Sequence, residues 1–141
     1  MATIPTSVSS RINAAPRQAE DSNMIEWHDL TVPDAEQARD FYTSVLGLHA
    51  EPVDMGGYSD FNLVDPKTKT PVAGVCHARG SNTDLPPQWM AYFTVADLDA
   101  SLQALQQGGG AVLGEPKTMG SSRYAFVRDP FGAVCALFER G

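Results

Sequence analysis

Cysteines, basic side chains and long apolar runs are all scarce in this chain of 141 residues. Its two cysteines, Cys76 and Cys135, stand in apolar stretches, which predicts buried free thiols of a reducing cytoplasm rather than a disulfide framework. No apolar run approaches the ~18 residues that span a membrane, so we expect no membrane partner. Lysine and arginine number 10 against 17 acidic residues, a formal net charge of -7, and phosphate binding needs clustered positive charge. A nucleic-acid partner is therefore not expected.

A hexad that occurs twice is the most informative feature present. Glu51–Gly56 (Glu-Pro-Val-Asp-Met-Gly) returns as Glu115–Gly120 (Glu-Pro-Lys-Thr-Met-Gly), and the pair Asp65-Pro66 returns as Asp129-Pro130 over the same interval. A repeat of such long period indicates a duplicated supersecondary unit, in which each copy needs its twin to bury its apolar face. We therefore expect a small molecule to bind in a pocket between the two modules.

The repeat divides the chain into an arm of residues 1–23 and two modules, residues 24–80 and 88–140. The arm is rich in Ser, Thr, Ala and Pro and lacks the apolar stretch of a secretory signal, so we expect it to be flexible or to strap a partner subunit. Each module is predicted as strand, helix and three strands, an α+β fold of two tandem βαβββ units whose curved mixed sheet surrounds a concave pocket. The predicted strands are 25–32, 48–54, 58–64 and 71–77, then 89–95, 111–115, 122–128 and 133–139.

Each module carries a clear helix signal after its first strand. Asp34 is a good N-cap and Gly47 suits the left-handed position that ends a helix. The apolar residues between them follow a core-facing stripe, namely Ala38, Phe41, Tyr42, Val45 and Leu46. The second helix is expected from about Asp97 to Gln107, ending at a run of three glycines.

Alternation along the first strand of each module separates two faces. Leu30 and Val32, like Phe93 and Val95, are the more apolar sets and should face the helices. The alternate residues should line the pocket: Trp27, Asp29 and Thr31 in the first module, and Met90, Tyr92 and Thr94 in the second.

Two segments of the sequence resemble the vicinal oxygen chelate superfamily, which includes glyoxalase I, bleomycin-resistance proteins and extradiol dioxygenases. They are Asp40–Leu48 (Asp-Phe-Tyr-x-x-Val-Leu-Gly-Leu) and Phe126–Val134 (Phe-Val-Arg-Asp-Pro-Phe-Gly-Ala-Val), and the resemblance covers about residues 24–140. It implies a glyoxalase-like domain of paired βαβββ modules. It also implies four metal ligands, commonly His and Glu, from the first and last strands of each module.

In this sequence those four ligand positions fall on Trp27, Met90, Ala136 and, with the least certain register, Gly74. None of these side chains can hold a hard divalent metal. The pattern resembles a branch of the superfamily without the usual metal, so no cofactor is predicted. A divalent metal is kept only as a disfavoured alternative, held by His28 and His77 at non-standard positions.

Asp29 is the candidate catalytic residue, because a carboxylate beside Trp27 would be desolvated and suited to act as a general base or cation anchor. A structural hydrogen bond is the competing interpretation. His28, His77 and His49 are more often packing or surface residues than ligands. The predicted ligand-binding residues are Trp27, Thr31, Gly74, Cys76, Met90, Tyr92, Tyr124 and Ala136.

Three functions remain open on the sequence alone, and whether the chain is an enzyme stays undecided. The first is a metal-independent enzyme or binding protein with a small-molecule pocket. The second is sequestration of a cationic, drug-like compound in an acidic, aromatic cleft. The third is a metal-dependent lyase or dioxygenase using His28 and His77. A cytoplasmic homodimer is expected, because paired units of this kind often close their sheets across a two-fold axis.

Overall fold

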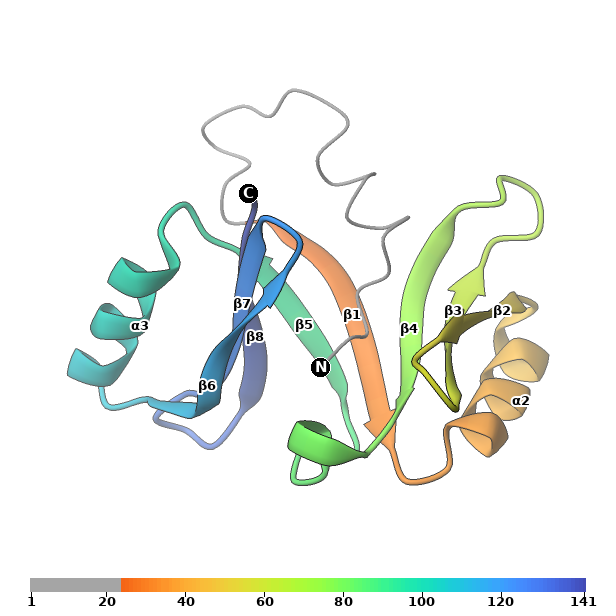
Figure 1. Ribbon diagram of the computed structural model, residues 1–141, viewed down its shortest axis with the longest axis horizontal. Coiled ribbons are helices and arrows are strands. Elements are labelled where there is room, and N and C mark those ends of the chain that lie inside the picture. The colour runs from red at the N-terminus through yellow and green to blue at the C-terminus, as the bar shows by residue number, and fades with distance from the viewer. Residues whose placement is uncertain (1–23) are drawn as a thin grey trace. The chain divides into compact units, whose positions relative to one another are not determined.

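The computed structural model describes residues 24–141, and the arm of residues 1–23 lies outside the described residues, so its expected role stays a prediction. The described chain divides into two compact units (Figure 1). The first unit contains residues 27–89, and the second contains residues 24–26 and 90–141. Each unit combines one helix with four strands, which confirms the α+β class and the two tandem βαβββ modules.

The first unit is a mixed four-stranded sheet with one helix on it. Its elements are β1 (Ile25–Val32), α2 (Ala35–Leu46), β2 (His49–Asp54), β3 (Ser59–Val64), β4 (Pro71–His77) and a short 3-10 helix, η2 (Gly80–Asn82). The strand order is β2-β3-β4-β1, with β1 parallel to β4 and the other pairs antiparallel. The first two residues of β1 group with the second unit.

Helix α2 begins and ends as its sequence predicts. The side chain of Asp34 accepts a hydrogen bond from the backbone N–H of Gln37 at 3.0 Å, and Gly47 adopts a left-handed φ of 67°. The helix packs through Ala35, Ala38 and Tyr42 against a core that includes Phe61, Leu63 and Val75.

The apolar stripe predicted for α2 is partly wrong. Phe41, Val45 and Leu46 are 59%, 60% and 53% exposed, although the sequence pattern placed them in the core. Successive helical residues are rotated by about 100°, so Phe41 lies well around the helix from the half-buried Tyr42. The contact with the sheet is narrower than the stripe, because two of its three anchoring residues are alanines that allow close approach of the helix.

The second unit repeats this topology. Its elements are β5 (Trp89–Thr94), α3 (Leu98–Gln107), β6 (Ala111–Met119), β7 (Ser122–Arg128) and β8 (Val134–Glu139), in the strand order β6-β7-β8-β5. Strand β5 is parallel to β8, and the other pairs are antiparallel. Strand β6 is longer than predicted because a register shift between Leu113 and Lys117 carries the pairing past Pro116.

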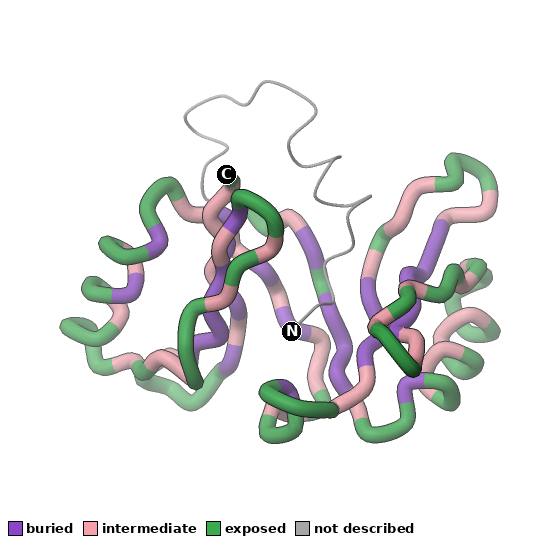
Figure 2. The backbone as a smooth tube through the Cα atoms, viewed as in Figure 1, coloured by how far each residue is buried: buried purple, intermediate pink, exposed green. Residues whose placement is uncertain are grey.

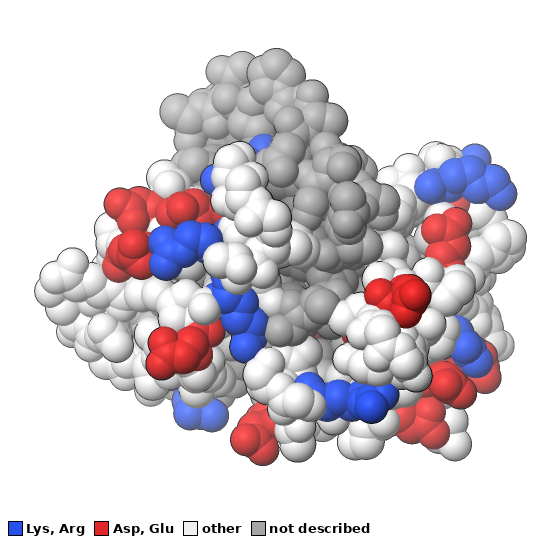
Figure 3. Space-filling view, viewed as in Figure 1, with Lys and Arg blue, Asp and Glu red and all other residues white. Residues whose placement is uncertain are grey.

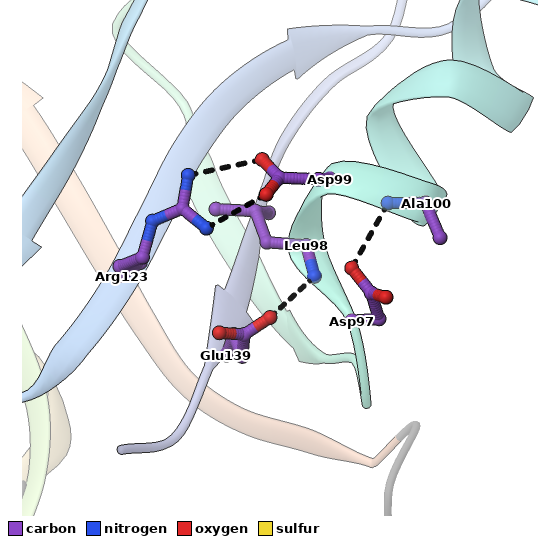
Figure 4. Close-up of polar contacts among 6 residues, drawn as sticks. All are labelled: Asp97, Leu98, Asp99, Ala100, Arg123 and Glu139. Atoms are coloured by element: carbon purple, nitrogen blue, oxygen red, sulfur yellow. Dashed lines mark hydrogen bonds and ion pairs between the residues drawn. The ribbon is translucent and has the colours of Figure 1, made fainter.

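Side chains from two strands anchor the first turn of α3 (Figure 4). Asp97 caps the helix by accepting a hydrogen bond from the N–H of Ala100 at 3.0 Å, and the Glu139 carboxylate accepts one from the N–H of Leu98 at 2.6 Å. Arg123 of β7 donates to both carboxylate oxygens of Asp99, at 3.2 and 3.0 Å. The helix N-terminus therefore has an acceptor from its own cap and another from β8.

We expect Glu139→Ala to lower the free energy of unfolding by about 1–2 kcal/mol, because it removes a negative acceptor from the start of a helix. Arg123→Ala is the control, because its ion pair with the largely exposed Asp99 is screened by solvent and should contribute little to stability. Urea denaturation of the two variants measures the difference. Equal losses in both would show that Glu139 does not cap α3.

Candidate ligand-binding face

The face of the first sheet that points away from α2 is unusually polar. Phe61, Leu63 and Val75 pack toward the helix, so the residues that alternate with them in β3 and β4 point the other way. The pairing of Leu30 with Val75 puts the alternate residues of β1 on that same side. We call this surface the polar face; it consists of Trp27, Asp29, Thr31, Asp60, Asn62, Gly74 and Cys76.

All seven residues of the polar face are buried, and most of them carry a polar group (Figure 2). The pairing registers arrange six of them in two rows across β3, β4 and β1. One row holds Asn62, Gly74 and Asp29. Because Gly74 has no side chain, no side chain stands between Asn62 and Asp29. The second row holds Asp60, Cys76 and Thr31. Buried polar side chains gathered on one sheet face are costly without hydrogen-bond partners, so their arrangement calls for a chemical reason.

Trp27 and Asp29 form a hydrogen bond inside this face. The indole Nε1–H of Trp27 donates to Oδ1 of Asp29 at 2.6 Å, and the two residues are 3% and 2% exposed. A bond to a buried carboxylate is among the stronger hydrogen bonds in proteins. It fixes both side chains, which gives Asp29 a structural role. A carboxylate can accept several hydrogen bonds at once.

Asp60 is a buried carboxyl that the sequence analysis missed. Its Oδ1 accepts a hydrogen bond from the backbone N–H of His77 at 2.9 Å, and the residue is 3% exposed. Burial raises the pKa of Asp60 above its ordinary value of 3.8, and the His77 bond and the charges of His77 and Arg79 oppose that rise without cancelling it. Arg79 stacks on the ring of Tyr58 with its guanidinium carbon 3.8 Å from the ring centroid.

Asp60→Asn should be more stable than the wild type at neutral pH and lose that advantage in acid. Asn keeps an oxygen for the His77 N–H but carries no charge. Between pH 3.8 and the higher pKa of the folded state, Asp60 ionises in the unfolded chain but keeps its proton in the folded one, so the free energy of unfolding of the wild type falls as the pH rises. Above the pKa of the folded state, this loss of stability is complete and no longer changes with pH. Urea denaturation of both proteins across this range measures the difference. A stability advantage of Asp60→Asn that does not change with pH, or no advantage at all, would contradict the raised pKa of Asp60.

Asn62 has a buried oxygen without a partner. The residue is 4% exposed, and its Oδ1 makes no hydrogen bond to any of the residues that the structure describes. A buried acceptor left unpaired costs about 1–3 kcal/mol. The signal for Asp60 and Asn62 was present in the sequence, since both alternate with Phe61 and Leu63 along a single strand.

The corresponding face of the second unit is aromatic. Ala125, Val127 and Leu137 pack toward α3, so the alternate residues of β5, β7 and β8 point away from it. Tyr92, Tyr124 and Phe126 form a cluster there, with ring centroids 5.8 to 6.4 Å apart. The predicted residues Met90, Tyr92, Tyr124 and Ala136 all belong to this face and are buried.

The structure fixes the internal equivalence of the two units. Asp29 pairs with Gly74 in the first unit, and Tyr92 pairs with Ala136 in the second. Trp27 and Met90 each lie two residues before these strand positions. Trp27 is therefore equivalent to Met90, and Gly74 to Ala136. The side chains at these four positions offer no hard oxygen or imidazole ligand.

The histidines do not form a shared centre. His77 pairs with Val32, so His28 lies four residues away along the neighbouring strand, a distance of about 13 Å at the rise of a β-strand. His28 and His49 are exposed. The ring of His77 lies edge-on to the ring of Tyr58, with the two ring centroids 5.6 Å apart. Within residues 24–141, no three His, Cys, Asp or Glu side chains are grouped so that they could hold a metal ion.

Cys76 and Cys135 are free cysteines, the first buried and the second partly buried. Burial raises the pKa of the Cys135 thiol, so it is not an activated nucleophile.

An open depression of about 440 Å³ lies beside α2 and β2 and contains none of the predicted site residues. On the surface visible in Figure 3, basic and acidic side chains lie close together. No helix among the described residues is both long and apolar enough to span a membrane.

Comparisons with known proteins agree on one superfamily. Residues 23–137 match the family model described as Glyoxalase/Bleomycin resistance protein/Dioxygenase superfamily. The anthracycline biosynthesis protein DauV of Streptomyces sp. (strain C5) is 32% identical over 127 residues, which cover 82% of this chain and 46% of DauV. The glyoxylase-like protein CFP32 of Mycobacterium bovis is 31% identical over 116 residues, covering 80% of this chain and 44% of CFP32. The chain thus spans less than half the length of these relatives.

Solved structures show the same fold at lower identity. Methylmalonyl-CoA epimerase of Mycobacterium tuberculosis is 20% identical, with a TM-score of 0.54 over 89% of this chain and 93% of the epimerase. The epimerase of Streptomyces coelicolor is 19% identical, with a TM-score of 0.51 over 84% of this chain and 98% of that protein. At these identities the likeness concerns the fold alone.

Proposed function

Because the chain belongs to the Glyoxalase/Bleomycin resistance protein/Dioxygenase superfamily, we propose that it binds a small organic molecule on the polar face of its first module, without a metal. The observation that carries this proposal is the set of buried polar side chains on that face, with Asn62 left unpaired. Binding sites typically combine apolar lining with a few convergent polar groups, and Trp27, Cys76, Asp29 and Asn62 make up such a mixture.

Asp29 is proposed as the anchor of the ligand. Its carboxylate is held in place by the 2.6 Å bond from Trp27, and it lies beside Gly74, a position without a side chain. The same group is the one on this face that could take a proton from a bound substrate, so it remains the candidate general base.

The ligand is proposed to contain fused aromatic rings. Two relatives, DauV and the Streptomyces peucetius protein DnrV, are named for anthracycline biosynthesis, and anthracyclines contain a fused-ring chromophore with hydroxyl groups. The buried indole of Trp27 suits contact with such a ring system. As a two-ring probe of this class we choose 2-naphthol.

Asp29→Asn should weaken 2-naphthol binding about tenfold, because the bond to a charged acceptor becomes one to a neutral amide. Isothermal titration calorimetry at neutral pH measures the change. Asp84→Asn, which alters an exposed carboxylate outside the polar face, is the matched control and should bind as the wild type does. Unchanged affinity in Asp29→Asn would remove Asp29 from the site.

Sequestration of a cation is the second candidate, favoured by two buried carboxylates on one face and a formal net charge of -7. It requires 2-naphthylmethylammonium to bind more than tenfold tighter than 2-naphthol, whereas our proposal requires comparable or weaker binding of the ammonium. Metal analysis of protein purified without chelator or affinity tag tests the third candidate. Stoichiometric metal lost on substitution of His28 or His77 would overturn the metal-independent proposal.

A further inference from the structure

We propose that Asn62 and Asp60 restrict the ligand to molecules that present a hydrogen-bond donor to the polar face, such as phenols, alcohols or amide N–H groups. This inference rests on the proposed function and specifies the class of ligand that the same face accepts. Ethers and ketones of the same shape, which only accept hydrogen bonds, belong to the excluded class.

Two side chains of β3 place acceptor oxygens on the polar face. Asn62 Oδ1 is buried and has no hydrogen-bond partner among residues 24–141. Asp60 stands two residues earlier on the same side of the strand, and within residues 24–141 its carboxylate accepts one hydrogen bond, from the backbone N–H of His77. An ionised carboxylate offers about four acceptor sites, so one such bond leaves most of its capacity unused.

Within residues 24–141, the neighbouring strands provide no hydrogen-bond donor for Asn62 Oδ1. In its row the next residue across the sheet is Gly74, which has no side chain, and beyond it lies the carboxylate of Asp29. The indole N–H of Trp27 is already directed to Asp29. On its other side Asn62 pairs with Glu51 of β2. Asn62 is therefore flanked by Glu51 on one side and by Gly74, then Asp29, on the other, and both of these carboxylates are acceptors.

The charged and titratable groups around Asp60 leave its acceptor role intact. His77 and Arg79 both favour its ionised form, while burial disfavours it. The guanidinium of Arg79 lies over the ring of Tyr58, and Tyr58 is in edge contact with the ring of His77. None of these side chains donates a hydrogen bond to Asn62.

A water molecule at Asn62 would satisfy its oxygen by donating a hydrogen bond. A ligand that displaces such a water must reproduce that bond or lose affinity. A ligand that enters an empty position instead gains by supplying a missing donor. Both cases select a donor group at the same place, so the inferred ligand class is the same in either one.

The test compares 2-naphthol with 2-methoxynaphthalene, in which a methyl group replaces the hydroxyl hydrogen. Titration calorimetry should give wild-type protein about tenfold tighter binding of the naphthol. Asn62→Leu should reduce this preference to less than about threefold by losing affinity for 2-naphthol. Asn82→Leu is the matched control: Asn82 also buries an unpaired Oδ1, but it lies in η2 outside the polar face and should leave the preference unchanged.

A measurement without ligand keeps the inference open to refutation. Removing an unpaired buried oxygen should not destabilise the fold, so Asn62→Leu should unfold at the same urea concentration as the wild type or a higher one. A lower midpoint would mean that Asn62 has a structural partner, which contradicts the inference. Should Asn62→Leu fail to fold, that result counts against it in the same way.

The outcomes separate the inference from the function on which it rests. If the wild type bound both probes equally well on the polar face, the ligand would not need a hydrogen-bond donor. That result would overturn this inference and leave the proposed small-molecule binding intact. A preference that survives in Asn62→Leu would overturn the role of Asn62. Failure of the wild type to bind either probe would contradict the proposed function itself, and the inference with it.

Discussion

Trp27→Phe should lower the free energy of unfolding by about 2–3 kcal/mol, the largest effect expected from losing one hydrogen bond in this chain. The substitution keeps an aromatic ring but removes the N–H that donates to Asp29 at 2.6 Å. The carboxylate then stays buried with one donor fewer. Because the bond is buried and its acceptor is charged, the cost should lie near the top of the range for hydrogen bonds.

A double-mutant cycle isolates this bond from the change in ring size. Trp27→Phe, Asp29→Leu and the double variant are compared with the wild type by urea denaturation. We expect a coupling energy of about 1.5–3 kcal/mol, because each single change removes one partner of the bond and leaves the other buried, while the double change removes both. A coupling energy below about 0.5 kcal/mol would show that the two side chains do not form this bond in solution.

Phe126→Ala should destabilise the second unit more than any other single substitution considered, by about 3–5 kcal/mol. Its ring is 2% exposed and packs edge-on against Tyr124 and Tyr92, with centroids 5.8 and 6.2 Å away. Truncation leaves a cavity among rings that cannot easily close over it. Edge-to-face aromatic pairs also contribute beyond the area they bury.

Phe126→Leu is the matched control, since it keeps most of the buried volume and loses only the ring contacts. We expect it to cost about 1–2 kcal/mol, clearly less than the alanine variant. Thermal or urea denaturation distinguishes the two. Losses below about 1 kcal/mol in both variants would indicate that the aromatic cluster is loosely packed, and would favour a ligand-lining role for this face over a structural one.

The repeat and its register could be predicted from the sequence because they are encoded locally. The hexads Glu51–Gly56 and Glu115–Gly120 both run to the end of the second strand of a module, and each ends in a glycine of positive φ, 82° and 60°. A turn after a strand requires such a residue at one place, so two copies of the turn leave two copies of the motif. The same anchors align Trp27 with Met90.

The error at α2 arises because a helix pattern does not reveal how wide the contact with a sheet will be. Phe41, Val45 and Leu46 satisfy the periodicity of a buried stripe, yet the packing uses Ala35, Ala38 and Tyr42. The width of that contact depends on tertiary packing, which one sequence does not record.

Two of the seven residues of the polar face, Asp60 and Asn62, were missed for a different reason. The first strand drew attention to Trp27 and Asp29 through its resemblance to known ligand positions, whereas Asp60 and Asn62 lie on β3, where no motif marks them. Their alternation with Phe61 and Leu63 predicts which side they share. Their lack of partners is visible only once β4 and β1 are paired beside them.

The most direct test of the central claim is an NMR titration of isotopically labelled protein with 2-naphthol, following the backbone amide signals. The account predicts that the largest shifts fall on β1, β3 and β4, at residues of the polar face such as Asp29, Asn62 and Cys76, and that they shrink in Asp29→Asn. Shifts confined to the depression beside α2 and β2, or no shifts up to the solubility of the probe, would contradict it.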